Sequence, residues 1–319
     1  MRSFDLFNGD ADGLCALHQL RMVEPRSACL VTGIKRDIEL FRHLPAVPLL
    51  DVTALDICFD RNAGHVRQVL QAGGEVRYFD HHAASELFEH PRLKACIDLS
   101  PEVCTSLLVD RHLGGRHRDW AITAAFGDNL VSVALRLAQE QGLGDEASAQ
   151  LRHLGLLLNY NAYGEAVQDL HFHPLALYEA LHAYESPFDF IAGSAQYRAL
   201  DEGHREDQRH ASALRPHRES RDGALYLLPC APWARRLSGT LANALAARSP
   251  GACVAVLTGR TEGGHLVSVR TRGGIGADVL CRRYAGGNGR AGAAGIDRLP
   301  EAELDGFIAD FFRHIERGT

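Results

Sequence analysis

Short apolar runs alternate with longer amphipathic segments over the first 130 residues of the chain. The short runs predict strands over 4–7, 28–31, 47–50, 75–79 and 94–97. The amphipathic segments predict helices over 13–22 and 61–71, and the second stops at a glycine pair, which is typical of a helix C-terminus. Strands that alternate with helices, with few hairpin signals, predict a parallel α/β sheet.

The rest of the chain has two further patterns. Residues 103–185 are mainly helical, and 197–220 are charged and poor in large apolar residues, which indicates a solvated connecting helix and linker. A new alternation begins near Gly223, with strands over 224–228, 252–257 and 266–270 and helices over 234–248, 277–284 and 301–315. We therefore expect a first domain over 1–190, a helical linker over 191–221 and a smaller α/β domain over 222–319.

The composition is that of an ordinary globular protein. A chain of 319 residues, 46% hydrophobic and 23% charged, suits two domains. No apolar run reaches the roughly 18 residues of a membrane span. The acidic start of the chain is unlike a signal peptide. Eight cysteines without a Cys-x-x-Cys pair indicate reduced thiols, so we expect a cytoplasmic protein.

The net charge of −6 is unevenly distributed along the sequence. From Asp222 to the end, 12 arginines outnumber 9 acidic residues, so this part carries +3 and residues 1–221 carry −9. An acidic half suited to metal ions therefore precedes a basic half suited to phosphates, although random surface variation produces the same asymmetry. The overall charge argues against a protein that coats nucleic acid.

Acidic residues follow three of the predicted strands. Asp10 and Asp12 follow the first strand, Asp51 follows the strand over 47–50, and Asp80-His81-His82 follows the strand over 75–79. In parallel sheets, ligands bind beyond the carboxyl ends of the strands. A further candidate, between two predicted helices, is Asp128.

These residue types suit a pair of divalent ions. Carboxylates with an imidazole are ligands that Mn²⁺ and Mg²⁺ accept. Two such ions about 3.5–4 Å apart can activate a water and stabilise charge on a phosphoryl group. Each motif alone has a simpler explanation, such as a capped turn. Their joint occurrence, each after a strand, favours the metal site.

The same motifs resemble those of a known family. The four metal-site motifs of the DHH phosphoesterases resemble, in order, Asn8–Gly13, Asp51, Asp80-His81-His82 and Gly127-Asp128. The strand and glycine loop of the DHHA1 substrate domain resemble Val267–Gly273 and Gly286–Gly295. The resemblance covers nearly the whole chain. It implies an N-terminal parallel-sheet DHH-type domain with a helical extension and a C-terminal α/β DHHA1-type domain, with the active cleft between them.

The resemblance also implies a role for each residue. Two ions, Mn²⁺ or Mg²⁺, would be bound by Asp10, Asp12, Asp51, His81 and Asp128, with Asp51 as the bridge. The catalytic residues would be Asp80 and His82, with His82 beside the scissile phosphate. The substrate would be held by Arg270, Arg272, Gly287, Asn288, Gly289 and Arg290.

Two positions depart from the family pattern. Many members carry a histidine ligand shortly before the first aspartate, where this chain has Leu6-Phe7-Asn8. The first ion site is therefore weaker, or Asn8 supplies an oxygen. Arg290 stands where the loop usually has histidine; arginine binds phosphate bidentately but does not donate a proton near neutral pH. Lys35, after the second strand, is expected to flank the cleft.

The function expected from these features is metal-dependent hydrolysis of phosphate esters by an activated water. The substrate would be a nucleotide or a short single-stranded oligonucleotide, such as a dinucleotide or pAp, because long duplex DNA needs many phosphate contacts. Two alternatives stay open, namely an exopolyphosphatase- or pyrophosphatase-like hydrolase and a degenerate nucleotide-binding regulatory protein. The sequence leaves the oligomeric state undetermined.

Overall fold

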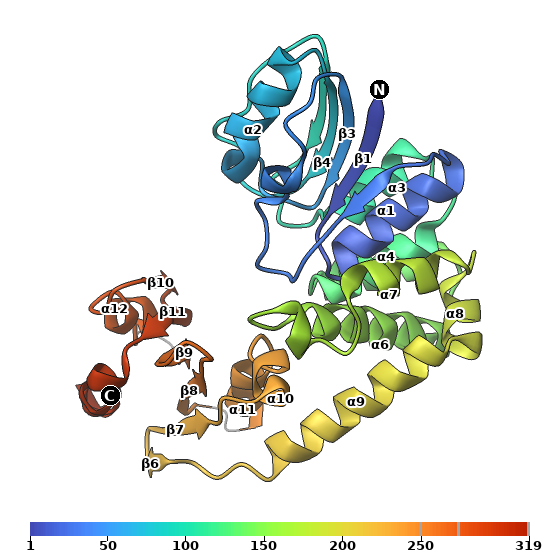
Figure 1. The fold of residues 1–319 in the computed structure, drawn as a ribbon. Coiled ribbons are helices and arrows are strands. Elements are labelled where there is room, and N and C mark those ends of the chain that lie inside the picture. The colour runs from blue at the N-terminus through green and yellow to red at the C-terminus, as the bar shows by residue number, and fades with distance from the viewer. Residues whose placement is uncertain (249–250, 273–274, 318–319) are drawn as a thin grey trace. The chain divides into compact units, whose positions relative to one another are not determined.

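The computed structural model describes residues 1–248, 251–272 and 275–317 (Figure 1). The chain forms two compact units. Unit 1 comprises Met1–Ala162 and Ala166–His204, and unit 2 comprises Tyr163–Glu165 and Arg205–Thr319. The division falls inside helix α9 (Ala195–Ser212).

Unit 1 contains a sheet of five parallel strands, which confirms the predicted α/β fold class. The strands lie in the order β2-β1-β3-β4-β5. Their bounds are Arg2–Phe7 for β1, Cys29–Val31 for β2, Leu50–Leu55 for β3, Glu75–Asp80 for β4 and Leu93–Ile97 for β5. From β1 the chain passes to β2 on one side and then to β3 on the other. The loops after β1 and β3 therefore border a topological switch point, where open α/β sheets bind ligands.

The two faces of this sheet are covered by different helices. Successive strand residues point to opposite faces. Leu6 accordingly belongs to a core with α2 (Phe59–Gln71) and the 3₁₀ turn η1 (Leu40–His43). Phe7 belongs to a core with α1 (Ala11–Val23). Residues 11–21 of α1 are all buried, so this helix is a central element that begins directly after β1.

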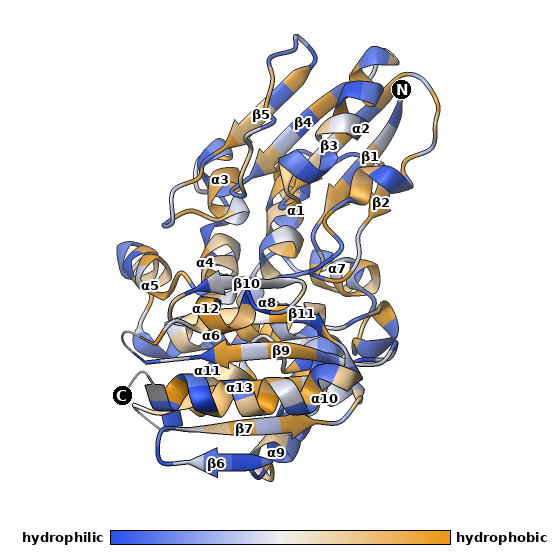
Figure 2. Ribbon diagram, turned by 90° about the vertical axis from the view of Figure 1, so that its left-hand side faces the viewer, coloured by the Kyte–Doolittle hydropathy of each residue, from blue (hydrophilic) through white to orange (hydrophobic). Residues whose placement is uncertain are grey.

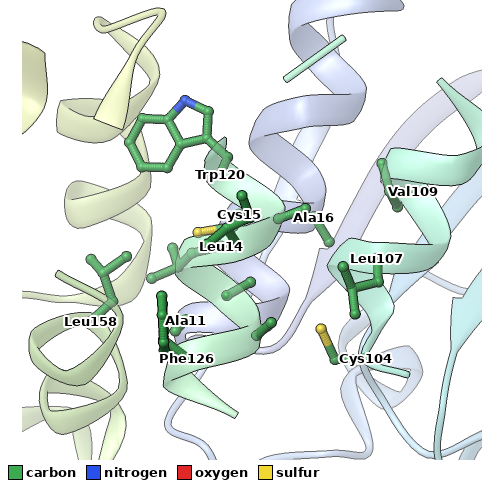
Figure 3. Packing of buried hydrophobic residues seen from close by; sticks show 14 of the residues in the cluster. Ala11, Leu14, Cys15, Ala16, Cys104, Leu107, Val109, Trp120, Phe126 and Leu158 are labelled. Carbon is green, nitrogen blue, oxygen red and sulfur yellow. The ribbon is translucent and has the colours of Figure 1, made fainter. Parts of the chain in front are cut away.

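A layer of helices packs around α1. Its members are α3 (Thr105–His112), α4 (Arg118–Gly127), α5 (Val131–Glu140), α6 (Asp145–Ala162), α7 (Pro174–His182) and α8 (Pro187–Gly193), with a 3₁₀ turn η2 at Val167–Asp169. Figure 3 shows side chains of α1, α3, α4 and α6 directed toward one another, among them Leu14, Leu107, Phe126 and Leu158. The helical extension expected from the sequence is therefore part of the core of unit 1.

Unit 2 has a mixed sheet in the order β10-β11-β9-β8-β7-β6. Among its described strands, only the β7–β8 pair is parallel. The strands are β6 (Arg218–Ser220), β7 (Gly223–Leu228), β8 (Cys253–Gly259), β9 (His265–Arg270), β10 (Gly287–Arg290) and β11 (Ala293–Leu299). The helices are α10 (Pro232–Arg236), α11 (Leu241–Arg248), α12 (Ala277–Cys281) and α13 (Leu304–Arg317), with a 3₁₀ turn η3 at Glu301–Glu303. Figure 2 shows hydrophilic and hydrophobic residues interspersed along α13, whose apolar side chains enter the core of this unit.

The glycine-rich segment differs from its predicted loop. Gly287–Arg290 and Ala293–Leu299 pair as an antiparallel hairpin at the edge of the sheet. Gly289 has φ of 139°, and a Cβ there would lie 2.4 Å from the Ala294 Cα atom. The glycine therefore permits close contact between the two strands, where a side chain would separate them. Gly273, the last residue of the preceding strand motif, lies outside the described residues.

Among the described helices, none combines the length and the apolar character needed to cross a bilayer.

A buried histidine gives unit 1 a defined response to acid. His18 on α1 lies edge-on to Trp120, with its Nδ1 2.9 Å from that of His182. Burial lowers the pKa of His18 to about 3, with a further contribution from His182. The unfolded chain takes up this proton below pH 6.5 and the folded chain does not, so stability is lost as the pH falls from 6.5 toward 3.

We predict that His18→Gln removes this part of the acid sensitivity. Between about pH 6.5 and pH 4 the unfolding free energy of the parent should fall by roughly 3 kcal/mol more than that of the variant. Urea unfolding in a Trp233→Phe background, with Trp120 fluorescence as the probe of unit 1, measures the difference. The exposed His217→Gln should follow the parent, and equal slopes for parent and His18→Gln would contradict the prediction.

Candidate metal centre

Asp10 links the end of β1 to the start of α1. It caps α1, and its Oδ1 accepts hydrogen bonds from the backbone N–H groups of Asp12 and Gly13, both at 3.1 Å. Its Oδ2 accepts a hydrogen bond from Lys35 Nζ. The local sequence folds in this way because an aspartate before a helix satisfies N–H groups that lack partners in the first turn.

Asp12 reaches from α1 to the N-terminus of α3. Its Oδ2 accepts the backbone N–H of Thr105 and its Oδ1 that of Ser106, each at 2.7 Å. The carboxylate thus serves as the cap of α3, whose own N-cap residue Cys104 makes no side-chain cap. Asp12 is buried, and the dipole of α3 favours a negative charge at this position.

Asp56 follows β3 and faces the same place. Its side chain is only 3% exposed, and its Oδ1 accepts a hydrogen bond from the Thr105 hydroxyl at 3.2 Å. Its backbone has φ of 59°, in the left-handed region that non-glycine residues adopt rarely. Such strained residues cluster at functional sites.

Asp80 is the last residue of β4, and His81 and His82 follow it. The Oδ1 of Asp80 lies 2.6 Å from Nδ1 of His82, and its Oδ2 is buried with no partner among the described residues. His81 Nε2 lies 3.4 Å from Asp56 Oδ1 and 3.9 Å from Asp12 Oδ2. His81 is therefore the residue that meets carboxylates from several loops.

Asp128 completes the cluster from the end of α4. It is the C-cap of that helix, and its Oδ2 lies 3.7 Å from His81 Nε2. Its Oδ1 lies 3.9 Å from Lys35 Nζ. The structure thus brings together Asp10, Asp12, Asp80, His81, His82 and Asp128 of the predicted set.

The predicted position of Asp51 is wrong. The strand over 47–50 is actually β3, Leu50–Leu55, so Asp51 lies near the beginning of the strand and not after its end. Its side chain is 37% exposed and pairs with Arg26 at 2.8 Å. Asp56 stands at the carboxyl end instead. The sequence contains a signal for it, since the run Val52–Leu55 also ends on an aspartate, as the other two strands do.

Burial and the charges of neighbouring carboxylates raise the pKa of Asp56 and Asp128. Burial raises the pKa of Asp56 well above its usual range, and the charges of Asp12 and Asp10 add to the effect. Burial and the same two charges raise the pKa of Asp128 to about 6. Burial opposes ionisation of Asp10 as well, but the Lys35 ammonium holds the pKa of Asp10 below its ordinary value. For His82, burial lowers the pKa, but the hydrogen bond to Asp80 outweighs this and raises it.

This donor set fits a divalent cation. The ligand atoms of Asp12, His81 and Asp128 lie within 4.8 Å of one another, as do those of Asp56, His81 and His82. Oxygen donors with an imidazole suit Mn²⁺ or Mg²⁺. A cation would also offset the repulsion that contributes to the raised pKa of Asp56 and Asp128.

Unit 2 places three of the predicted substrate residues, Arg270, Asn288 and Arg290, on one face of its sheet, whereas Gly287 and Gly289 alternate with them along β10. Arg270, Ala293 and Arg290 are aligned across β9, β11 and β10, and Ser268, Gly295 and Asn288 are aligned beside them. Residues in register share a face. Small residues on β11 thus separate two arginines by about 10 Å, two strand spacings. Arg272 differs, because its guanidinium pairs with Asp222 at 2.9 Å.

We predict that Asp56→Asn stabilises the metal-free protein and weakens Mn²⁺ binding. The change removes a buried charge, and asparagine tolerates the left-handed backbone. The free energy of unfolding without metal should rise by ~1–3 kcal/mol. Asp51→Asn, near the opposite end of β3, is the matched control, because loss of its surface ion pair should cost about 1 kcal/mol or less. Calorimetric Mn²⁺ titration and urea unfolding test both variants; weaker binding in Asp51→Asn alone would reverse the assignment.

Comparison with known proteins gives matches among solved structures. No protein-family model matches the sequence, and no curated protein matches it. The crystal structure of exonuclease RecJ bound to manganese is 17% identical with a TM-score of 0.62, over 99% of this chain and 90% of that chain. RecJ from Thermus thermophilus, in complex with Mn²⁺, is 16% identical with a TM-score of 0.58, over 99% of this chain and 52% of that chain.

A third structure matches over the full length of both chains. It is PggH, a pGpG-specific phosphodiesterase from Vibrio cholerae, with 16% identity and a TM-score of 0.58. Similarity at this level of identity establishes the fold. The chain therefore has the fold of RecJ and PggH, in agreement with the resemblance of its motifs to the DHH phosphoesterases.

Proposed function

We propose that the protein is a divalent-metal-dependent phosphoesterase of the DHH/DHHA1 type. The observation that carries the proposal is the convergence of five carboxylates and two histidines at the switch point of the parallel sheet. A protein that only binds nucleotides has little need for so many buried acids, because each one costs stability unless a cation compensates it.

The residues that would hold a cation are Asp12, Asp56, His81 and Asp128. They come from four separate segments, and His81 belongs to both groups of closely spaced ligand atoms. When bound, Mn²⁺ or Mg²⁺ lowers the pKa of a coordinated water and stabilises negative charge on a phosphoryl group. Thr105 and Ser106 fix Asp12 and Asp56 through hydrogen bonds, so these two carboxylates are preorganised.

His82 and Asp80 form a hydrogen-bonded pair suited to proton transfer. The bond uses Nδ1, so Nε2 is the ring nitrogen that remains for a substrate. Asp80 is fully buried, and it both orients the ring and favours the protonated form. We assign to His82 contact with the scissile phosphate group or protonation of the leaving oxygen.

The proposed substrate is a nucleotide or a short single-stranded oligonucleotide. The row of Arg270, Ala293 and Arg290 places two arginines on one face of the sheet with a small residue between them, which suits a phosphate chain. Hydrogen bonds to Asn243 Oδ1 and to the Val269 carbonyl position the Arg270 guanidinium. Solved structures with the same fold include an exonuclease bound to manganese and a pGpG-specific phosphodiesterase, and they support this class of substrate. A polyphosphate substrate would use the same arginines, so the first experiment includes it.

We expect Mn²⁺-dependent hydrolysis of one class of substrate. The panel contains pAp, 5′-phosphorylated di- to pentanucleotides, linear and cyclic dinucleotides, single-stranded DNA and polyphosphate. Asp80→Asn should lower kcat by ~10²-fold or more, because it removes the charge that orients and protonates His82. Product formation is followed by ion-exchange chromatography.

Asp51→Asn is the control for this experiment and should retain full activity. Turnover of polyphosphate alone would identify the alternative hydrolase. Tight Mn²⁺ binding without turnover of any substrate would favour a regulatory nucleotide-binding protein. Absence of Mn²⁺ binding would overturn the phosphoesterase assignment.

We further predict that Arg270→Ala and Arg290→Ala each raise KM for the preferred substrate by ~10-fold or more, the usual effect of one charged phosphate contact. Steady-state kinetics separate this from kcat, which should change less. Arg313 lies on α13 and pairs with Asp310 at 2.8 Å, so Arg313→Ala is a matched loss of one surface arginine. If KM is unchanged in both Arg270→Ala and Arg290→Ala, this face of the sheet is excluded as the substrate site.

A further inference from the structure

Asp10 differs from the other carboxylates of the cluster because it accepts a hydrogen bond from a lysine ammonium. Both groups of closely spaced ligand atoms contain His81, and among the described residues Asp10 belongs to neither. Its Oδ1 accepts two backbone N–H groups of α1, and its Oδ2 accepts the Lys35 ammonium. Each oxygen of Asp10 therefore already accepts a hydrogen bond, and one of the donors is a cation.

The Lys35 ammonium occupies a position lined by oxygen atoms. Besides Asp10 Oδ2, it donates to Asn159 Oδ1 at 3.1 Å and lies 3.9 Å from Asp128 Oδ1. A carboxylate, an amide oxygen and a second carboxylate are the donors that a hard divalent ion would take. An ammonium has three donors of its own and satisfies the same oxygens with a single positive charge.

The backbone holds Lys35 in this place. Its N–H donates to the carbonyl of Ala162 at 3.0 Å, and its carbonyl accepts the Asn8 side-chain amide at 3.3 Å. The loops that follow β1 and β2 also meet closely, since a Cβ at Gly9 would lie 2.1 Å from the Gly33 oxygen. A glycine at this point lets the Lys35 loop pack beside Asp10. The lysine is thus built into the site, and it is 25% exposed.

We propose that Lys35 is the resident cation of the Asp10 side of the cluster, so that the chain binds one divalent ion, around His81. The inference rests on the proposed function and replaces the two ions expected from the sequence by one ion and one ammonium. A second divalent ion between Asp10 and Asp128 would be repelled by an ammonium at the same oxygens. Both groups of ligand atoms also contain His81. Since they share this residue, we interpret them as alternative descriptions of one ion position.

The number of bound ions in the full chain tests this proposal. Mn²⁺ titration by calorimetry, with metal content measured after desalting, should give one ion per chain. The electron paramagnetic resonance spectrum should be that of an isolated Mn²⁺, because two ions about 4 Å apart would couple magnetically. Two coupled ions in the parent protein would overturn the proposal and leave the phosphoesterase assignment intact. No bound ion would overturn both.

Substitution of Lys35 gives an independent measurement. Lys35→Met should bind a second Mn²⁺ at least ~10-fold more tightly than the parent and show the coupled spectrum, because its ammonium no longer blocks the Asp10 oxygens. The chain has only one other lysine, the exposed Lys94, and Lys94→Met should bind one ion like the parent.

A second variant controls for the possibility that Lys35→Met misfolds because the Asp10 carboxylate loses its ammonium partner. Lys35→Met with Asp10→Asn removes both charges and should remain folded with one ion, by circular dichroism and metal content. A single uncoupled ion in a folded Lys35→Met would contradict the role given to Lys35.

Discussion

Five carboxylates lie close together at the topological switch point between β1 and β3 of the parallel sheet. Four of them are almost wholly buried. Charges in such a place are tolerated only with compensating partners. Asp12 accepts hydrogen bonds from N–H groups in the first turn of α3. Asp10 accepts hydrogen bonds from N–H groups in the first turn of α1 and from the Lys35 ammonium. Asp80 is hydrogen-bonded to the imidazole of His82. These hydrogen bonds therefore link the positions of α1, α3 and the connecting loops to the buried carboxylates. The charge that remains uncompensated around Asp56 and Asp128 is what a metal ion would neutralise.

The sequence predicted much of this site because it obeys a local rule. The aspartates at or just beyond the carboxyl ends of β1 and β4 stand where an apolar run stops, and in a parallel sheet such positions share one edge. The rule failed for β3 because Asp51 interrupts its apolar residues and was taken as the end of the strand. The structure tolerates the charge there through Arg26, a residue 25 positions away in sequence. Contacts of this kind leave no local pattern, and the same holds for the position of Lys35 beside Asp128.

In unit 2 the helices and central strands were predictable, and the hairpin was not. Glycine-rich segments lack the β-branched and aromatic residues that mark strands, so β10 gives no strand signal. Its pairing depends on the partner strand β11, whose backbone approaches Gly289 too closely for a side chain. The proposed phosphate surface therefore has a defined backbone, and the spacing of its arginines is set by the sheet register. The predicted helix over 234–248 is two helices, α10 and α11, in the structure.

The strand order also bears on how the chain folds. Parallel pairing of β1 with β3 joins residues about fifty positions apart, and such non-local contacts form slowly. Because β2 precedes β3 in the chain, the acids of the first loop can meet the loop after β2 before β3 is in place. Lys35 lies on the loop that follows β2, only 25 residues from Asp10, so its ammonium can neutralise that carboxylate before Asp56 and Asp128 are brought in. A counterion encoded early in the chain would lower the barrier that repulsion places on closing the site, whether or not metal is available during synthesis.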